Sequence, residues 1–246
     1  MIRAEPSPLP RLAVAFDGAA LGPLEPAIDA LEGLPVLAKI GLSLFCAVGP
    51  AVVHHFHQAR LPVFLDLKLH DIPHQVALAV RAVTKLDIAL RTVHAAGGQA
   101  MLEAAVDAAN GKTKVLAVSV LTSLAQPDLD ATGHAIPLEQ IVAQRCRLAH
   151  ACGAAGVVLS PRELSWLGDL PKDFLRVTPG IRLQQGGDDQ QRTASAAEAI
   201  AAGADILVVG RPILAAADPR AAAMAHLEAI AAAHGAAAGG SNGDRR

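Results

Sequence analysis

The chain has 246 residues, an apolar content of 52% and a formal net charge of −2 at pH 7. This length suits one large domain or two small ones. A balanced charge, a single Trp and no Tyr argue against a nucleic-acid polymer as partner. The first ten residues lack the apolar core of a signal peptide, and no apolar run is long enough to span a membrane. We therefore expect a cytoplasmic protein whose Cys46, Cys146 and Cys152 stay reduced and partly buried in helices.

Short β-rich runs alternate with longer Ala-rich runs along the chain, and each pair has about the length of one βα unit. This alternation predicts parallel strands. The expected strands are Leu12–Phe16, Val36–Ile40, Val63–Lys68, Ile88–Val93, Val115–Val120, Gly156–Leu159, Phe174–Thr178 and Ile206–Val209. Eight such units in this length predict an α/β fold, a single (β/α)₈ TIM barrel.

A doubly wound open sheet is the competing architecture, but it usually has a glycine-rich turn after its first strand. Here that strand ends in Asp17-Gly18-Ala19-Ala20, which is no dinucleotide-binding pattern. We expect outer helices at Glu25–Leu31 and Ala194–Ala202. The expected organisation is an N-terminal extension over residues 1–10, a barrel over 11–235 and a disordered C-terminal tail over 236–246, whose composition is too polar to bury.

The run Phe64-Leu-Asp66-Leu-Lys68-Leu-His-Asp71 places two carboxylates and an ammonium at the end of an apolar strand. Side chains two positions apart share a face of a strand, so Phe64, Asp66 and Lys68 should point one way and Val63, Leu65 and Leu67 the other. Asp71 should lie on the turn into the next helix. Because buried charge is costly unless it is paired, this minus-plus-minus set indicates a chemical role.

Polar side chains also follow most of the other expected strands. In a barrel these strand ends open on one face, the face that carries active sites. The residues are Asp17, Lys39, His94, Thr122, Arg182 and Arg211. One solvated strand end is ordinary, whereas so many together favour a functional site.

Gly210-Arg211-Pro212 after the last strand indicates a phosphate site. A glycine lets backbone N–H groups approach an anion, the following helix points its positive end at it, and Arg211 adds a bidentate donor. Gly180, before Arg182, could act similarly. Loops after the seventh and eighth strands are the usual phosphate site of such barrels.

A metal site is not indicated. His54, His55 and His57 fall on an amphipathic helix with no third ligand nearby, so a solvated helix surface is favoured. No nucleophile elbow, Walker loop or paired-cysteine zinc spacing appears.

Asp66-x-Lys68-x-x-Asp71, Thr178-Pro-Gly-Ile-Arg182 and Gly210-Arg211 together resemble the orotidine 5′-phosphate decarboxylase family, from about Leu12 to about Pro219. The resemblance implies a homodimeric TIM barrel without metal or organic cofactor. It implies conversion of orotidine 5′-monophosphate to uridine 5′-monophosphate and carbon dioxide, the last step of de novo pyrimidine nucleotide synthesis.

The resemblance also implies roles for individual residues. Lys68 would protonate C6 of the pyrimidine, Asp66 would lie beside the substrate carboxylate, Lys39 would pair with Asp66 and the ribose, and Asp71 would reach into the neighbouring subunit's site. The implied substrate-binding residues are Asp17 at the ribose hydroxyls, Thr122 at the pyrimidine edge, Gln190, Gly210 and Arg211 at the phosphate, Arg182 in or near that loop, and Ile72, Gln75 and Pro179. His94 would lie near the site.

Two other functions remain open from the sequence. Sister sugar-phosphate enzymes of the hexulose-phosphate synthase or ketogulonate-phosphate decarboxylase type share Asp-x-Lys-x-x-Asp and typically need magnesium. The second of these functions is a non-catalytic nucleotide-binding barrel, although a protein that only binds its ligand gains little from burying Asp66, Lys68 and Asp71. Family members often carry small hydroxyl or amide residues after Pro73, whereas this chain has His74-Gln75.

Overall fold

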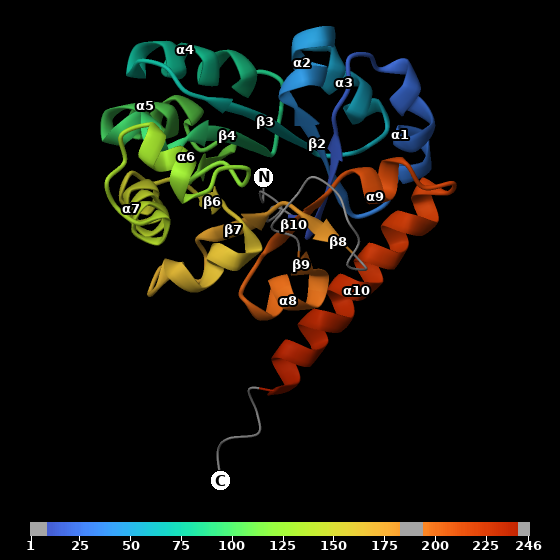
Figure 1. Cartoon of the computed structure of the whole chain (residues 1–246). Helices are drawn as coiled ribbons and strands as arrows, with labels where there is room; N and C mark the ends of the chain where they lie inside the picture. The colour runs from blue at the N-terminus through green and yellow to red at the C-terminus, as the bar shows by residue number, and fades with distance from the viewer. Residues whose placement is uncertain (1–8, 183–193, 241–246) are drawn as a thin grey trace, which may run out of the picture.

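The computed structural model describes residues 9–182 and 194–240. In these residues, eight parallel strands close into a barrel in the order β1-β10-β7-β6-β5-β4-β3-β2 (Figure 1). The strands are β1 (Leu12–Phe16), β2 (Val36–Gly41), β3 (Val63–Leu69), β4 (Leu90–His94), β5 (Lys114–Val118), β6 (Gly156–Val158), β7 (Leu175–Thr178) and β10 (Ile206–Val209). The expected TIM barrel is confirmed, and the open sheet is excluded because β1 pairs with both β2 and β10.

Helices surround this barrel and connect its strands (Figure 1). They are α1 (Glu25–Leu31), α2 (Leu42–Val48), α3 (Ala51–Gln58), α4 (Pro73–Thr84), α5 (Gly98–Ala109), α6 (Gln126–Ala131), α7 (Leu138–Ala151), α8 (Ala196–Ala201), α9 (Arg211–Leu214) and α10 (Pro219–Gly240), with 3₁₀ turns at Gly22–Leu24, Ala95–Gly97 and Pro161–Leu167. A separate two-stranded sheet pairs β8 (Ile181–Arg182) with β9 (Ala194–Ser195).

The strand and helix boundaries differ from the sequence expectations by one or two residues at most elements. The largest strand shifts are of two residues: β4 begins at Leu90 rather than Ile88, and β5 ends at Val118 rather than Val120. Ile88 is buried against the helical layer, so its apolar character reflects packing before the strand starts. The expected helix at Ala194–Ala202 begins with the short β9 and becomes helical only at Ala196.

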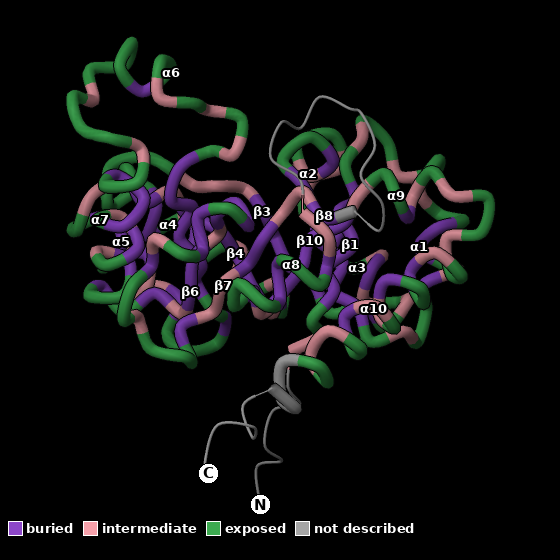
Figure 2. The backbone as a smooth tube through the Cα atoms, turned by 60° about the horizontal axis from the view of Figure 1, so that its bottom comes forward, coloured by how far each residue is buried: buried purple, intermediate pink, exposed green. Residues whose placement is uncertain are grey.

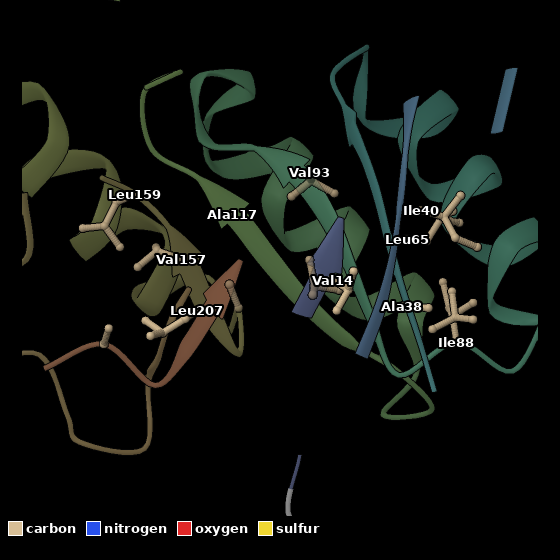
Figure 3. Close-up of a cluster of buried hydrophobic side chains, with 14 of the residues drawn as sticks. Val14, Ala38, Ile40, Leu65, Ile88, Val93, Ala117, Val157, Leu159 and Leu207 are labelled. Carbon is tan, nitrogen blue, oxygen red and sulfur yellow. The ribbon is translucent and has the colours of Figure 1, made fainter. Parts of the chain in front are cut away.

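Two apolar layers follow from the alternation of side chains along each strand. The inner layer fills the barrel and consists of Ala13, Ala15, Leu37, Phe64, Leu90, Leu116, Val177, Ile206 and Val208. The outer layer lies between strands and helices, and Figure 3 shows part of it, including Val14, Ile40, Leu65 and Val93. The strands are accordingly almost entirely buried (Figure 2).

Helix α10 packs against α8, α9 and α1 and forms the long diagonal of Figure 1. It runs to Gly240, so the expected domain boundary at residue 235 falls inside a helix, while residues 241–246 lie outside the described part. No described helix is long and apolar enough to cross a membrane. All three cysteines are free, and Cys146 and Cys152 are buried, whereas Cys46 on α2 is exposed rather than partly buried.

Candidate active site

A cavity of about 890 Å³ opens at the carboxyl ends of the barrel strands. Side chains from five of the strand ends that the sequence indicated line it. The lining residues that carry polar or charged side chains are Asp17, Lys39, Asp66, Lys68, Thr122, Ser123, Arg211 and His226, and Pro179, Gly180 and Gly210 contribute to the wall. The strand ends therefore converge on one cavity, as expected for a barrel.

Strand β3 directs its alternate residues as the sequence predicts. Phe64 belongs to the inner apolar layer and Leu65 to the outer one, and Asp66 and Lys68 line the cavity. Near its end the strand departs from regular geometry, because its register with β4 shifts between Leu65 and Leu69. Lys68 lies within this irregularity with φ +50°, a left-handed conformation that is uncommon for non-glycine residues and that recurs at functional sites.

Four side chains form a charged array of alternating sign: Asp17, Lys39, Asp66 and Lys68. The Lys68 ammonium donates to both carboxylate oxygens of Asp66 at 2.9 Å. Lys39 Nζ lies 3.3 Å from Asp66 Oδ2 and 3.7 Å from Asp17 Oδ1. Asp66 and Lys39 are buried, whereas the side chain of Lys68 is 38% exposed and that of Asp17 60%. The array therefore runs from a buried centre to two ends open to the cavity.

Asp66 stays ionised in this setting. Burial by itself raises the pKa of its carboxyl, but the charges of Lys39 and Lys68 and hydrogen bonds from Lys68 and Thr92 outweigh burial and hold the pKa below its usual value. The carboxylate thus stands as a fixed negative charge between two cations.

Comparison with known proteins gives the family. A model described as the orotidine 5′-phosphate decarboxylase / HUMPS family matches residues 10–226. The chain belongs to this family. Two relatives named orotidine 5′-phosphate decarboxylase are each 47% identical: one from Halorhodospira halophila over 91% of this chain and 97% of its own, and one from Anaeromyxobacter sp. strain K over 89% and 97%.

Solved structures agree with this membership. The crystal structure of orotidine 5′-phosphate decarboxylase from Lactobacillus acidophilus matches with a TM-score of 0.80 and 34% identity, over 89% of this chain and 98% of that one. An uncharacterized conserved protein from Geobacillus kaustophilus matches with a TM-score of 0.79 and 31% identity, over 89% and 99%.

Some residues that the family resemblance singled out lie away from the cavity in this single chain. Asp71, Ile72 and Gln75 are exposed at the start of α4 and do not line it. Asp71 Oδ1 accepts from the N–H of Ile72 at 2.6 Å. Arg182 is placed in β8 by its backbone, its side chain is not described, and Gln190 lies outside the described residues.

The sequence reasoning missed Thr92 and Gly41. The Thr92 hydroxyl, fully buried, donates to Asp66 Oδ1 and accepts from the backbone N–H of Lys68, both at 2.8 Å. A Cβ on Gly41 would overlap the carboxylate of Asp17. Thr92 lies two positions after Leu90 and therefore shares the inward face of β4. This alternation was a signal in the sequence that Thr92 points into the barrel. The close approach at Gly41 depends on a contact across two strands.

His94 lies near the array, as the resemblance implied, but not on the cavity wall. Its ring stacks on that of His70 with centroids 5.3 Å apart, and its Nδ1 accepts from the N–H of Ala96 at 3.2 Å. Burial lowers the pKa of His94 to about 4, with further repulsion from His70, Arg145 and Lys68. His94 is therefore neutral near pH 7.

The described residues contain no group of three or more His, Cys, Asp or Glu side chains that could hold a metal ion. His54, exposed, and His55 and His57, half-buried, line one side of α3, where His55 Nε2 lies 3.5 Å from Glu25 Oε1. This arrangement agrees with the expected helix surface.

Proposed function

We propose that this chain decarboxylates orotidine 5′-monophosphate to uridine 5′-monophosphate and carbon dioxide, the last step of de novo pyrimidine nucleotide synthesis. The observation that carries the proposal is the Lys68 ammonium, held by both oxygens of Asp66 at the wall of a nucleotide-sized cavity. The names of the relatives at 47% identity support it.

Lys68 is the proton donor in this proposal. When the bond between C6 and the carboxyl carbon breaks, the electron pair stays on C6, where the ring delocalises it poorly. An ammonium aimed at C6 stabilises this charge and then transfers its proton to the carbon. The half-open position of Lys68 lets water return a proton to the neutral amine after each turnover.

The rest of the array orients and polarises the substrate. Asp66, ionised, lies beside the substrate carboxylate. Lys39 pairs with Asp66 and the ribose, Asp17 binds ribose hydroxyls, and Thr122 contacts the pyrimidine edge. Since charge in the array is balanced and fixed before the substrate arrives, little reorganisation is needed during the reaction.

The phosphate binds at the opposite side of the cavity, where Gly210, Arg211 and Pro179 line the wall. Arg182 and Gln190 complete this end in the proposal. Helix α9 has only four residues, so its dipole adds less than a long helix would, and the main attraction comes from the Arg211 guanidinium. Phosphate binding energy then positions the distant ring.

We propose a cytoplasmic homodimer in which Asp71 acts in the neighbouring subunit's site. Asp71 is exposed next to Ile72, whose side chain is apolar and 63% exposed. An apolar side chain beside a charged one at a cavity-bearing face is suited to an isologous contact. Ile72 and Gln75 would touch the partner's ribose. The reaction in this proposal needs no metal or organic cofactor, since the array supplies the charge.

A spectrophotometric assay with orotidine 5′-monophosphate tests the function. We expect the substrate to be consumed with release of uridine 5′-monophosphate, at a rate that a chelator does not change. Magnesium-dependent turnover of a sugar phosphate without consumption of orotidine 5′-monophosphate would assign the chain to a sister activity. Binding of uridine 5′-monophosphate without turnover would make it a non-catalytic barrel. Either result overturns the proposal.

A further inference from the structure

Between β5 and α7 the chain leaves the barrel over residues 121–137, a stretch that contains α6 and that we call the α6 segment. Its first three residues, Leu121, Thr122 and Ser123, line the cavity. Only Leu129 of the whole segment is buried, and Figure 2 shows the segment standing away from the strands with most of its length exposed. Because so little apolar surface is buried, the position of the segment depends largely on polar bonds to the rest of the protein.

The Arg145 guanidinium of α7 joins the returning limb of this segment to the barrel. Its Nη1 donates to the carbonyl oxygen of Ser119 at 2.8 Å, and its Nη2 lies 3.1 Å from His134 Nε2. Ser119 is the first residue after β5 and is fully buried, and its N–H and its hydroxyl both donate to the carbonyl oxygen of Val158 in β6. Arg145 is therefore fixed at the barrel end and holds the exposed limb through His134.

His134 carries this connection on to α6. Its backbone N–H donates to the Leu129 carbonyl at 3.0 Å, and its Nδ1 lies 3.2 Å from the Thr132 hydroxyl, which bonds to the same carbonyl at 2.9 Å. Because the hydroxyl donates its one hydrogen to a carbonyl, it accepts from Nδ1–H of the ring. His134 Nε2 is then left as an acceptor, which is what the guanidinium requires, since it only donates.

The connection acts close to Thr122, the residue proposed to contact the pyrimidine. Thr122 follows Ser119 by three residues, so their Cα atoms are at most about 11 Å apart. On the other side of Thr122, Gln126 closes the neck of the segment. Its Oε1 accepts from the N–H of Leu138 at 2.6 Å, and its Nε2 donates to the Ile136 carbonyl at 3.3 Å. Thr122 thus lies between two anchored points of the chain.

We propose that Arg145 and His134 are positioning residues for recognition of the pyrimidine, because their bond holds the segment that presents Thr122 to the edge of the base. Neither side chain lines the cavity, so neither acts by touching the substrate. This inference rests on the proposed function, which places the base of a pyrimidine nucleotide at Thr122 and its phosphate at Gly210 and Arg211. Loosening the segment should therefore affect the base end of the ligand alone.

Two ligands separate the base end of the cavity from its phosphate end. Uridine 5′-monophosphate carries both groups, whereas ribose 5-phosphate lacks the base. By calorimetric titration we expect Arg145→Met to weaken uridine 5′-monophosphate about threefold to tenfold, the equivalent of one net hydrogen bond, and to leave the affinity for ribose 5-phosphate unchanged. Arg147→Met, at an exposed arginine of the same helix, is the matched control and should bind both ligands like the wild type.

Variants of His134 test whether the bond itself is responsible. His134→Leu removes the acceptor and should weaken uridine 5′-monophosphate as Arg145→Met does, whereas His134→Gln offers an amide oxygen and should recover part of the loss. Combining Arg145→Met with His134→Leu should add little to either loss, since both remove one interaction. Amide hydrogen exchange should be faster over residues 121–137 in these two variants and unchanged in the barrel strands.

The outcomes separate this inference from the proposed function. If the wild type decarboxylates orotidine 5′-monophosphate but Arg145→Met and His134→Leu bind uridine 5′-monophosphate normally, only the positioning role is wrong. An equal loss for both ligands also overturns that role, because the defect is then not confined to the base end. Full additivity of the two substitutions overturns it as well. If the wild type neither turns over the substrate nor binds uridine 5′-monophosphate, both the inference and the proposed function are wrong.

Discussion

Lys68 combines the ammonium that we propose as proton donor with a left-handed backbone conformation (φ +50°). Such a conformation costs about 1–3 kcal/mol for a non-glycine residue and persists only where the surroundings enforce it. Here the surroundings are two bonds: its ammonium binds Asp66, and its backbone N–H binds the Thr92 hydroxyl. The strand end is therefore held in place by the same residues that hold the charge.

Lys68→Ala removes the proposed proton donor. We expect the rate of decarboxylation to fall at least about a hundredfold, the low end of what a general acid contributes. Steady-state assays with orotidine 5′-monophosphate measure this. Lys85→Ala, at an exposed lysine at the end of α4, is the control, and near-normal turnover by Lys68→Ala would reject the role.

Thr92→Val has the shape of threonine without the hydroxyl, so it tests the support of Asp66 and Lys68. We expect kcat to fall about tenfold and the free energy of unfolding to fall by about 1–3 kcal/mol, because a buried N–H loses its acceptor. Urea denaturation and kinetics measure the two effects. Thr92→Ser keeps the hydroxyl and should restore most of both, and equal behaviour of Val and Ser would contradict the assignment.

His94 makes stability depend on pH. Its pKa is about 4 in the folded protein and about 6.5 in an unfolded chain. Between these values the unfolded chain binds a proton that the folded chain does not, so the free energy of unfolding decreases as pH falls from about 6.5 to 4. The pKa values of His226 and His234 are also lowered and act in the same direction.

His94→Asn keeps an acceptor for the N–H of Ala96 but removes the titrating ring. We expect this variant to lose less stability than the wild type between pH 7 and pH 4.5 in urea denaturation series. His54→Asn, at an exposed histidine of α3, should follow the wild-type curve. Parallel curves for His94→Asn and the wild type would show that His94 does not cause the slope.

At the scale of elements, the site depends on how neighbouring strands meet. Asp66 is reached by Lys68 from its own strand, by Lys39 from β2 and by Thr92 from β4. At the register shift between β3 and β4, the backbone N–H of Lys68 lies within hydrogen-bond distance of the Thr92 hydroxyl. Strand β2 ends in Gly41, where the missing side chain leaves room for the Asp17 carboxylate that follows β1.

Gly41→Ala therefore displaces Asp17 without touching the substrate. We expect KM for orotidine 5′-monophosphate to rise about tenfold to a hundredfold, because bonds to the ribose are lost. In an Asp17→Ala background the same substitution should add little, since its target is gone. Gly22→Ala, where an added Cβ meets nothing within 4 Å, is the control, and full additivity would contradict this route.

At the scale of the whole molecule, the role proposed for Asp71 would make the active site a property of two chains. If Asp71 acts in trans, Lys68→Ala and Asp71→Ala chains that are each inactive should complement each other. A mixed dimer holds one intact site and one site with both changes. After random mixing we expect about a quarter of wild-type activity, because half of the dimers are mixed and each has one of two sites intact.

This recovery is measured after unfolding the two variants together and refolding them, with each variant refolded alone as the control. No recovery in the mixture, together with proof of mixed dimers by mass, would mean that Asp71 acts within its own chain.

The sequence determined the barrel and the core of the site. Eight strand-like runs at βα spacing allow few topologies, and alternation along β3 alone places Asp66 and Lys68 on the inner face, because side-chain direction in a strand is a local property. The strand-end signals of Asp17, Lys39, Thr122 and Arg211 also follow from position in the chain. The start of β4 was predicted two residues too early, at Ile88, because the sequence does not distinguish a buried apolar residue before a strand from one within it.

Only the tertiary structure decided what depends on approach between strands and helices. The bonds from Thr92 to both Asp66 and Lys68, and the room that Gly41 leaves for Asp17, join residues far apart along the chain. Their roles come from distances set by register, curvature and helix docking. These are outcomes of how the closed barrel packs, and no periodicity in the chain encodes them separately.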